Sequence, residues 1–371
     1  MGDNDANPGL RPLTLSSLRA SGFRNLSPCS LAFGERFNVF FGDNGAGKSS
    51  LLEAIAYLAC LRSFRGAKRD DIIAQGSQAA VLDAQLTAAP FPRRFQVALD
   101  RQSGRRVRVD GKRPSSLGSY FGSFPAVVFH PGDVELISGP PEPRRAVLDR
   151  ILEQIDPTYA KRLADYTKAL RSRNRLLKEP RIDRRSVVAY DAMLAPLGAQ
   201  IGQARARVAG ALKPLVESHF AEVTEQALEL TFDYAFRHEP EQATLERALE
   251  ESFVRDRARG FTGVGPHTDD LRVSAQVALA KHHASQGQHR AIVLSLKVAE
   301  LSVLGARTGQ IPPLLLDDLS SELDRRRNRR FFSLLSRLGG QVFLSTTHRE
   351  LILLDHARKD FELDGGVVKA V

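Results

Sequence analysis

The chain has 371 residues, 42% of them hydrophobic and 26% charged, a composition typical of a globular protein with one large or two medium domains. No apolar run reaches the length of a membrane span, the first residues lack the order of a secretory signal, and the two cysteines, Cys29 and Cys60, exclude a disulfide framework. The formal net charge of +10 suits a polyanionic partner, and these features together indicate a cytoplasmic protein.

The N-terminal third alternates short apolar segments with polar turns. Residues 1–12 are expected to be a disordered tail, because the first eight are polar and acidic. The segments that follow predict strands with one early helix. The expected strands lie at 13–15, 37–41, 80–86, 95–99, 107–109 and 125–129.

A glycine-rich segment follows the strand expected at 37–41. It reads G-D-N-G-A-G-K-S, which matches the phosphate-binding pattern G-x-x-x-x-G-K-[ST], and an apolar helix is expected directly after it. In this setting the backbone N–H groups point at phosphate oxygens, Lys48 reaches the outer phosphates and the Ser49 hydroxyl binds Mg²⁺. The sequence therefore predicts nucleotide binding by Gly42, Asp43, Asn44, Gly45, Ala46, Gly47, Lys48 and Ser49.

A helical block occupies the middle of the chain. From Pro143 to about Arg259 the chain has few glycines and many Leu, Ala, Arg and Glu at helical spacing. Four prolines, Pro157, Pro180, Pro196 and Pro214, are expected to punctuate its helices. After residue 260 strands and helices alternate again, with strands expected at 271–273, 313–316 and 341–344 and helices at 288–306 and 323–338.

The strand expected at 313–316 ends in two carboxylates. Asp317 fits the carboxylate that a phosphate-binding ATPase places near Mg²⁺, and Asp318 is placed to hold the attacking water as a general base. The alternative for this pair alone is a strand that ends in a turn. Because Lys48 and Asp317 lie 269 positions apart (317 − 48) in a chain of 371 residues, we expect an α/β sheet built from both chain ends, with the helical block inserted between them.

Three further segments place polar groups at the ends of expected elements. The segment S-Q-G-Q at 285–288 predicts a capped helix N-terminus; its functional interpretation is a second anion site, and the alternative is a helix cap alone. His348 follows the last expected strand, at the edge where α/β sheets bind ligands, and the alternative is a histidine without a role there. His267, Asp269 and Asp270 are of the types that ligate metals, and the alternative is a turn that opens the next strand.

The motifs G-D-N-G-A-G-K-S, S-Q-G-Q, L-L-L-D-D, S-E-L-D and T-T-H, in this order, resemble those of the ABC-type ATPase heads of SMC-like DNA-repair proteins. Three stretches, at 129–133, 171–178 and 265–271, narrow the resemblance to the RecF family, and it covers nearly all of 13–371. It implies an α/β fold, an ABC-type, SMC-like P-loop ATPase head with a large helical insertion. The expected parts are the tail (1–12), the N-terminal part of the ATPase lobe (13–135), the helical insertion (136–260) and the C-terminal part of the lobe (261–371).

The resemblance also assigns roles to residues. Asp317 and Asp318 end the Walker B strand, although SMC-like heads usually carry Glu where Asp318 stands. His348 is the switch histidine, and Gln78 is the Q-loop residue, with Gln75 as the alternative. Residues 321–324 form the D-loop. The signature consists of Ser285, Gln286, Gly287 and Gln288, and it differs from the S-G-G-Q of transporters.

The function implied by the resemblance is an ATP-dependent DNA-binding protein of recombinational repair and replication restart. Such a protein binds ATP and Mg²⁺, forms an ATP-dependent homodimer, engages double-stranded and single-stranded DNA at gaps or junctions, and hydrolyses ATP slowly as a switch. RecF proteins act with RecR and RecO to help load the RecA recombinase, and contribute to the SOS response. Arg65 is a candidate for coupling DNA to ATP, and the alternative is a surface arginine. The rival function is another ABC-type ATPase, a transporter or translation-associated subunit.

Overall fold

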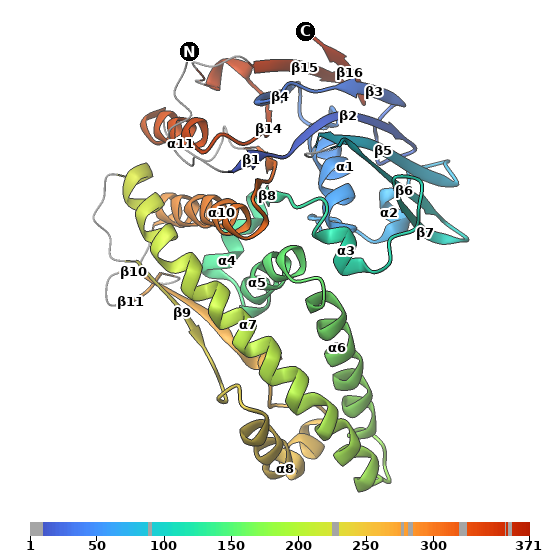
Figure 1. Cartoon of the computed structure of the whole chain (residues 1–371), viewed down its shortest axis with the longest axis vertical. Coiled ribbons are helices and arrows are strands. Elements are labelled where there is room, and N and C mark those ends of the chain that lie inside the picture. The colour runs from blue at the N-terminus through green and yellow to red at the C-terminus, as the bar shows by residue number, and fades with distance from the viewer. Residues whose placement is uncertain are drawn as a thin grey trace. The chain divides into compact units, whose positions relative to one another are not determined.

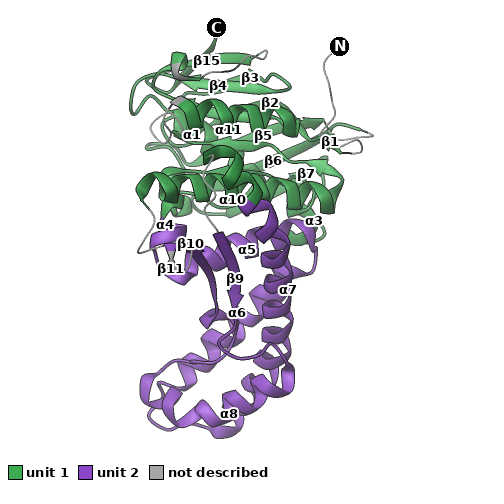
Figure 2. Cartoon of the chain, turned by 90° about the vertical axis from the view of Figure 1, so that its left-hand side faces the viewer, with its two compact units in different colours: residues 1–134, 218–227, 285–371 green, residues 135–217, 228–284 purple. Residues whose placement is uncertain are grey.

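The computed structural model divides the chain into two compact units, coloured separately in Figure 2. Unit 1 comprises 1–134, 218–227 and 285–371, and unit 2 comprises 135–217 and 228–284. Unit 2 thus extends past residue 260, because strand β9 (Leu230–Ala235) pairs with β10 (Asp270–Ala275). The structure describes residues 10–87, 91–224, 230–275, 278–280, 285–318, 325–352, 354 and 358–371.

A six-stranded sheet in unit 1 draws its strands from both ends of the chain, as the positions of Lys48 and Asp317 predicted (Figure 1). In spatial order the strands are β16 (Val367–Ala370), β15 (Arg358–Asp364), β4 (Phe37–Phe41), β14 (Val342–Thr346), β13 (Leu314–Leu316) and β8 (Val127–Phe129). All neighbours are parallel except β15 and β16. The first four residues of β4 are buried, as is typical of a strand covered on both faces.

A five-stranded antiparallel sheet forms the other layer of unit 1. Its strands, in spatial order, are β3 (Cys29–Ala32), β2 (Thr14–Ser21), β5 (Ala79–Thr87), β6 (Arg93–Asp100) and β7 (Gly104–Val109). Alternate residues of β5 are buried, so one face of this sheet packs into the core and the other faces solvent. Helix α1 (Lys48–Cys60) contacts β13 and β14 of the first sheet and β5 and β6 of the second.

Burial explains why α1 forms the centre of unit 1. Its residues Ser50 to Ala59 are all buried, which is the pattern of a helix enclosed on every side. The remaining elements of unit 1 are β1 (Arg11–Pro12), α2 (Arg69–Ile72), α3 (Leu117–Phe121), η1 (Pro131–Val134), α10 (Gln286–Thr308), β12 (Gln310–Ile311), α11 (Arg325–Leu338) and η4 (Arg349–Leu351).

Unit 2 is mainly helical, with a small antiparallel sheet of order β11-β10-β9. Its elements are α4 (Glu135–Ser138), α5 (Pro141–Ile155), α6 (Tyr159–Leu176), α7 (Arg184–Thr224, whose last turns belong to unit 1), α8 (Gln242–Arg259), η2 (Pro266–Thr268) and β11 (Ala278–Leu279), besides β9 and β10. In the described part of the chain no helix is both long and apolar enough to cross a membrane.

Helix α7 corrects one expectation, because it continues through Pro196 and Pro214. A proline inside a helix removes a backbone hydrogen bond and costs about 3 kcal/mol. Burial beside Pro196 offsets that cost, since the side chains of Leu194, Ala195 and Ala199 are at most 5% exposed.

A buried arginine holds the helices of unit 2 together. The Arg173 guanidinium, 0% exposed, donates to Asp191 Oδ1 at 2.6 Å, to Asp256 Oδ2 at 2.8 Å and to Thr262 Oγ1 at 2.9 Å. These partners come from α7, from α8 and from the segment after α8. The stretch at 171–178, which carried the family resemblance, therefore has a structural role inside unit 2.

The three residues considered as metal ligands all bind protein groups instead. His267 Nδ1 accepts from the Tyr166 hydroxyl at 2.7 Å, and its Nε2 donates to a backbone carbonyl. Asp269 accepts from the hydroxyl of Tyr234, and Asp270 pairs with Arg144. These contacts agree with the turn interpretation, and the described residues contain no cluster of three or more His, Cys, Asp or Glu side chains that could hold a metal ion.

The buried imidazole of His267 predicts a loss of stability at low pH. Burial lowers its pKa below the usual 6.5, so the folded protein holds the ring neutral. The contribution of His267 to the free energy of unfolding is complete above pH 6.5, where the ring is neutral in both states. It falls as the pH drops from 6.5 towards the lower pKa of the folded state, because the unfolded chain takes up the proton first. The loss is at most about 1.4 kcal/mol per pH unit. We expect the free energy of unfolding in urea to fall more between about pH 7.5 and about pH 5.5 in the wild type than in His267→Gln.

The comparison isolates this one ring. The pKa values of His219 and His238 are also lowered by burial, but both histidines are present in the wild type and in the variant, so their contributions cancel. Equal pH dependence of the two proteins would contradict the prediction.

Candidate nucleotide site

The segment Gly42–Ser49 joins β4 to α1, and its conformation depends on glycine. The φ angles are +147° at Gly42, +82° at Gly45 and +109° at Gly47, in the region that other residues rarely adopt. Lys48 is the first residue of α1, and its Nζ donates to the carbonyls of Gly42 at 2.7 Å and Asp43 at 2.8 Å. The loop, with the N-terminus of α1 behind it, has the form of a phosphate cradle.

The hairpin of β15 and β16 supports this loop from the C-terminal side. A Cβ atom at Gly42 would overlap the carbonyl oxygen of Leu363. The Gly366 N–H donates to the Ala46 carbonyl at 3.0 Å, and a Cβ atom at Gly366 would overlap the carbonyl oxygen of Asn25. The loop is therefore packed between the hairpin and the segment that carries Asn25.

Asp317 joins the two halves of the site. Its Oδ1 accepts from the Ser49 hydroxyl at 2.8 Å and from the Ser345 hydroxyl at 2.7 Å, and its N–H donates to the Phe129 carbonyl at 2.9 Å. A carboxylate beside a hydroxyl is a donor set that fits Mg²⁺, which prefers oxygen ligands. Ser49 and Asp317, far apart in sequence, are thus placed together as the ATPase interpretation predicted.

Asp318 adopts a left-handed backbone conformation at the end of β13. Its φ is +52°, which is uncommon outside glycine, and its N–H donates to the Ser345 hydroxyl at 2.9 Å. Partial burial lowers the pKa of the Lys48 amine, while the carboxylates of Asp318, Asp317 and Asp43 act in the opposite direction. Lys48 therefore lies within the electrostatic field of both carboxylates.

A pocket of about 320 Å³ lies over the loop. It contains several of the residues predicted from the sequence, together with residues that the pattern did not single out. Among the latter, Asn25 donates to the Gly45 carbonyl at 2.9 Å and accepts from the Ser50 hydroxyl at 2.6 Å, contacts that only the folded chain creates. The lining residues are Asn25, Asn44, Gly45, Gly47, Lys48, Ser49, Ser50, Arg65, Asp318, Ser345 and Thr347.

Two of the predicted catalytic residues do not line this pocket. The Gln78 carbonyl accepts from the Arg101 N–H at 3.1 Å, just outside the hairpin of β5 and β6, and the Gln78 side chain is exposed, as is that of Gln75. The His348 side chain is 64% exposed and lies 3.4 Å from Glu350, whereas its neighbour Thr347 lines the pocket. Their roles stay predictions. Residues 321–324, the expected D-loop, lie outside the described residues.

The segment Ser285–Gln288 forms the N-terminus of α10. The Ser285 hydroxyl accepts from the Gln288 N–H at 3.3 Å, and the Ser285 N–H donates to Gln288 Oε1 at 2.8 Å, which is a capping box. Ser285 and Gln286 are exposed, and an added Cβ atom at Gly287 would lie 3.0 Å from Arg327 Nη1. The predicted helix cap is confirmed, and its outer surface is open to a partner.

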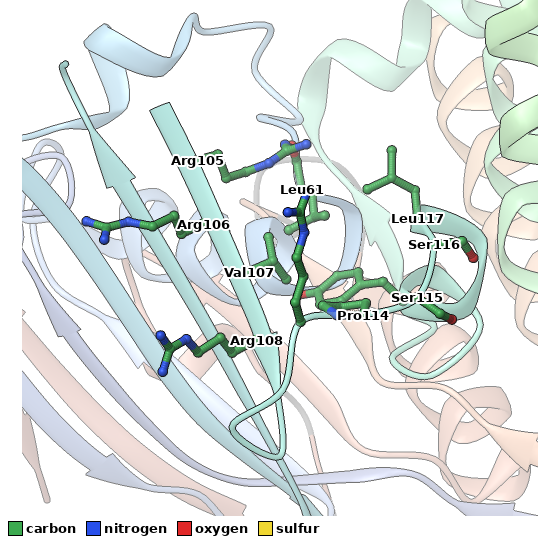
Figure 3. A pocket seen from close by; sticks show the side chains of 11 residues that line it. Leu61, Arg105, Arg106, Val107, Arg108, Pro114, Ser115, Ser116 and Leu117 are labelled. Atoms are coloured by element: carbon green, nitrogen blue, oxygen red, sulfur yellow. The ribbon is translucent and has the colours of Figure 1, made fainter. Parts of the chain in front are cut away.

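A second pocket, of about 860 Å³, lies at the outer edge of β7 (Figure 3). Figure 3 shows Arg106 and Arg108 extending to one side of the strand and Val107 to the other. Arg105 lies on the same side of the strand as Val107 and donates to the Leu61 carbonyl, so apolar and basic groups both contribute to the lining. The lining residues are Leu61, Arg105, Arg106, Val107, Arg108, Arg113, Pro114, Ser115, Ser116, Leu117 and Tyr120.

The strand register places further arginines beside Arg106 and Arg108 on the solvent face of the five-stranded sheet. Arg108 is opposite Gln96, Gln96 is opposite Asp83, and Asp83 is opposite Arg19, so these four share one face. Arg94 and Arg106 lie on the same face, and Arg94 pairs with Asp83. We call the set of Arg19, Arg94, Arg106 and Arg108 the basic sheet face.

Comparison with known proteins identifies the family. The model described as "RecF/RecN/SMC N terminal domain" matches residues 14–115. The chain is 37% identical to the DNA replication and repair protein RecF of Myxococcus xanthus, over 92% of both chains. It is 35% identical to that of Geobacter sulfurreducens, over 96% of this chain and 100% of the relative. The chain belongs to the RecF family.

Solved structures agree with the RecF assignment. A structure described as the recombination mediator protein RecF with ATP in the RecFOR pathway is 31% identical, with a TM-score of 0.89 over 98% of each chain. The Smc head domain of Pyrococcus furiosus is 17% identical, with a TM-score of 0.58, a likeness of fold alone. The ABC-type, SMC-like head predicted from the motifs is thus confirmed, and the full-length match to RecF sets aside a transporter or translation-associated subunit.

Proposed function

We propose that this chain is an ATP-dependent DNA-binding protein of recombinational repair and replication restart. The observation that carries the proposal is the contact of the Ser49 hydroxyl with Asp317 Oδ1 at 2.8 Å, which joins the phosphate loop to the Mg²⁺ carboxylate. Membership of the RecF family, whose curated members are named DNA replication and repair proteins, supports the same conclusion.

The residues in and beside the pocket have separate roles toward ATP. The loop N–H groups and Lys48 bind the phosphates. Ser49 and Asp317, which contact each other, would hold Mg²⁺, and the ion would neutralise phosphate charge. Asp318, which lines the pocket, orients the attacking water and accepts its proton. The assignment of Gln78 and His348 to catalysis rests on the family resemblance.

The exposed N-terminus of α10 supports an ATP-dependent homodimer. Its S-Q-G-Q segment presents helix N–H groups that attract anions, and it does not line the pocket of its own chain. We propose that it binds the γ-phosphate held by a second copy, so that two ATP molecules are buried between two chains. Hydrolysis then weakens the dimer, which makes the protein a slow switch.

DNA is the proposed partner of the basic sheet face. The net charge of +10 and the exposed arginines of β7 favour contacts to phosphates rather than to bases. We propose binding at gaps and at junctions of single-stranded and double-stranded DNA in the cytoplasm, with RecR and RecO as partners and RecA loading as the outcome. Increased retention on gapped duplex DNA in the presence of an ATP analogue tests this function, and equal retention without nucleotide would contradict it.

The basic sheet face can be tested by its salt dependence. We expect Arg106→Glu/Arg108→Glu to weaken binding to gapped duplex DNA and to flatten the slope of log K against log salt by up to about 1.8, about 0.9 for each DNA phosphate that is no longer neutralised. Fluorescence anisotropy with an ATP analogue at several salt concentrations measures both quantities. The control is Arg247→Glu/Arg257→Glu, two exposed arginines of α8 with the same change in charge. Equal losses in both double variants would show that only net charge matters.

A further inference from the structure

The segment F-H-P-G-D at 129–133 carried part of the family resemblance, but of its residues only Phe129, through its carbonyl, has a role in the site described above. Strand β8 ends at Phe129, whose carbonyl accepts from the N–H of Asp317. His130 therefore follows directly after the residue that pairs with the Mg²⁺ carboxylate. Its position, at the carboxyl end of a parallel strand, is where α/β sheets place functional residues.

The imidazole of His130 stacks on Phe64. The ring centroids are 5.4 Å apart and the ring planes are inclined by 28°. Phe64 precedes Arg65, which lines the nucleotide pocket. Because Phe64 and Arg65 are adjacent, the stack that holds the Phe64 ring also restricts Arg65, whose positive charge faces the phosphate site.

The loop that carries Arg65 is held on its other side by Ser63. The Ser63 hydroxyl accepts from the N–H of Arg65 at 3.0 Å and from the N–H of Ala67 at 3.1 Å, and it donates to Glu53 of α1. Glu53 is fully buried and also pairs with Arg24 at 2.8 Å. Ser63 thus holds the backbone of the loop, while the stack on His130 holds the side chain of Phe64.

A tight turn orients the His130 ring. The Gly132 N–H donates to His130 Nδ1 at 3.1 Å, and the His130 N–H donates to Asp133 Oδ2 at 3.0 Å. An added Cβ atom at Gly132 would lie 2.8 Å from His130 Cε1, closer than real Cβ contacts allow. Glycine at this position therefore leaves the space that the stacked ring occupies.

The same turn is anchored to α10. Asp133 is 6% exposed, and its Oδ2 lies 3.5 Å from Nζ of Lys297, which is itself buried in α10. Lys297 also lies 3.6 Å from Glu300 on the next turn of the helix. A buried lysine between two carboxylates keeps the turn in place, because separating these charges would leave each of them unpaired in the interior.

We propose that His130 is a positioning residue that acts through Phe64 and holds Arg65 over the nucleotide pocket. The proposal rests on the proposed binding of ATP in that pocket. It requires the flat ring of His130 rather than its titration, so another aromatic ring replaces it and a methyl group does not. It also predicts that His130 contributes nothing to nucleotide affinity once Arg65 has been removed.

The functional test is a double-mutant cycle on affinity for a fluorescent ATP analogue. We expect His130→Ala to weaken affinity about fivefold to tenfold, the size of a lost ring pair, and His130→Phe to stay within about twofold of the wild type. The double variant Arg65→Ala/His130→Ala should bind no more weakly than Arg65→Ala alone. Phe91→Ala, which removes a ring that is 75% exposed, serves as the control.

A second measurement needs no nucleotide. We expect amide hydrogen exchange of residues 63–67 to be at least about fivefold faster in His130→Ala and in Gly132→Ala than in the wild type, and unchanged in His130→Phe. This result separates the inference from the proposed function: a wild type that binds no ATP analogue would overturn the function, while exchange still reports on the stack.

Three outcomes would overturn the positioning role. The first is His130→Phe behaving like His130→Ala, since the stack alone would then not suffice. The second is additive losses of affinity from Arg65→Ala and His130→Ala, which would mean that His130 acts independently of Arg65. The third is unchanged exchange of residues 63–67 in both His130→Ala and Gly132→Ala.

Discussion

Lys48→Ala and Ser285→Arg are each expected to abolish ATP hydrolysis, and a mixture of the two is expected to recover part of it. Lys48→Ala removes the cation that lies beside both carboxylates, so ATP binding is lost as well. Ser285→Arg leaves the phosphate loop intact, so each monomer still binds ATP, but it places a positive side chain at a helix N-terminus that is to receive phosphate. ATPase assays of each variant and of the mixture measure the recovery.

The recovery follows from the geometry of a shared site. A heterodimer contains one composite site made of the intact loop of one chain and the intact signature of the other. Loss of the Ser285 cap costs about 1 kcal/mol, and α10 stays folded because its residues from Ala291 to Leu301 are all buried. An active Ser285→Arg monomer would refute the shared site, as would heterodimers, demonstrated by sedimentation, that hydrolyse no ATP.

Asp318→Asn is expected to slow hydrolysis by about 10²-fold or more while leaving ATP affinity unchanged, if the carboxylate is the general base. The substitution preserves the fold, because asparagine tolerates the left-handed backbone, here at φ +52°, better than other side chains do. ATP then persists between the chains, so the dimer should also persist. Single-turnover hydrolysis and analytical sedimentation test the two effects, with Ser333→Ala on the exposed side of α11 as a control. A wild-type rate in Asp318→Asn would mean that another group activates the water.

The sequence predicted the parts of the site that depend on local pattern. The glycines of 42–49 and the carboxylates after β13 are recognisable because each motif lies at the end of a strand, and parallel strands end at one edge of a sheet. The contact of Ser49 with Asp317 follows from these two placements. The order of strands in the sheet did not follow from them.

The features that sequence reasoning missed depend on packing between distant segments. Asn25, which holds the phosphate loop from the side, lies in a stretch without a pattern of its own. Pro196 was expected to interrupt a helix because proline disfavours helix interiors, but burial along α7 outweighs that preference. The strand Leu230–Ala235 of the small sheet in unit 2 was not predicted and was counted as part of the helical block. It is short, and its partner strand lies beyond α8 in the sequence.

During synthesis of the chain, the nucleotide site cannot form until the hairpin of β15 and β16 has been translated. The phosphate loop is made early on the ribosome, but its packing partners Leu363 and Gly366 are translated much later. Until they emerge, strand β4 also lacks both of its neighbours in the sheet, β14 and β15. A nascent chain therefore carries an unfinished site through most of its synthesis, and ATP can stabilise only a polypeptide whose two ends have met.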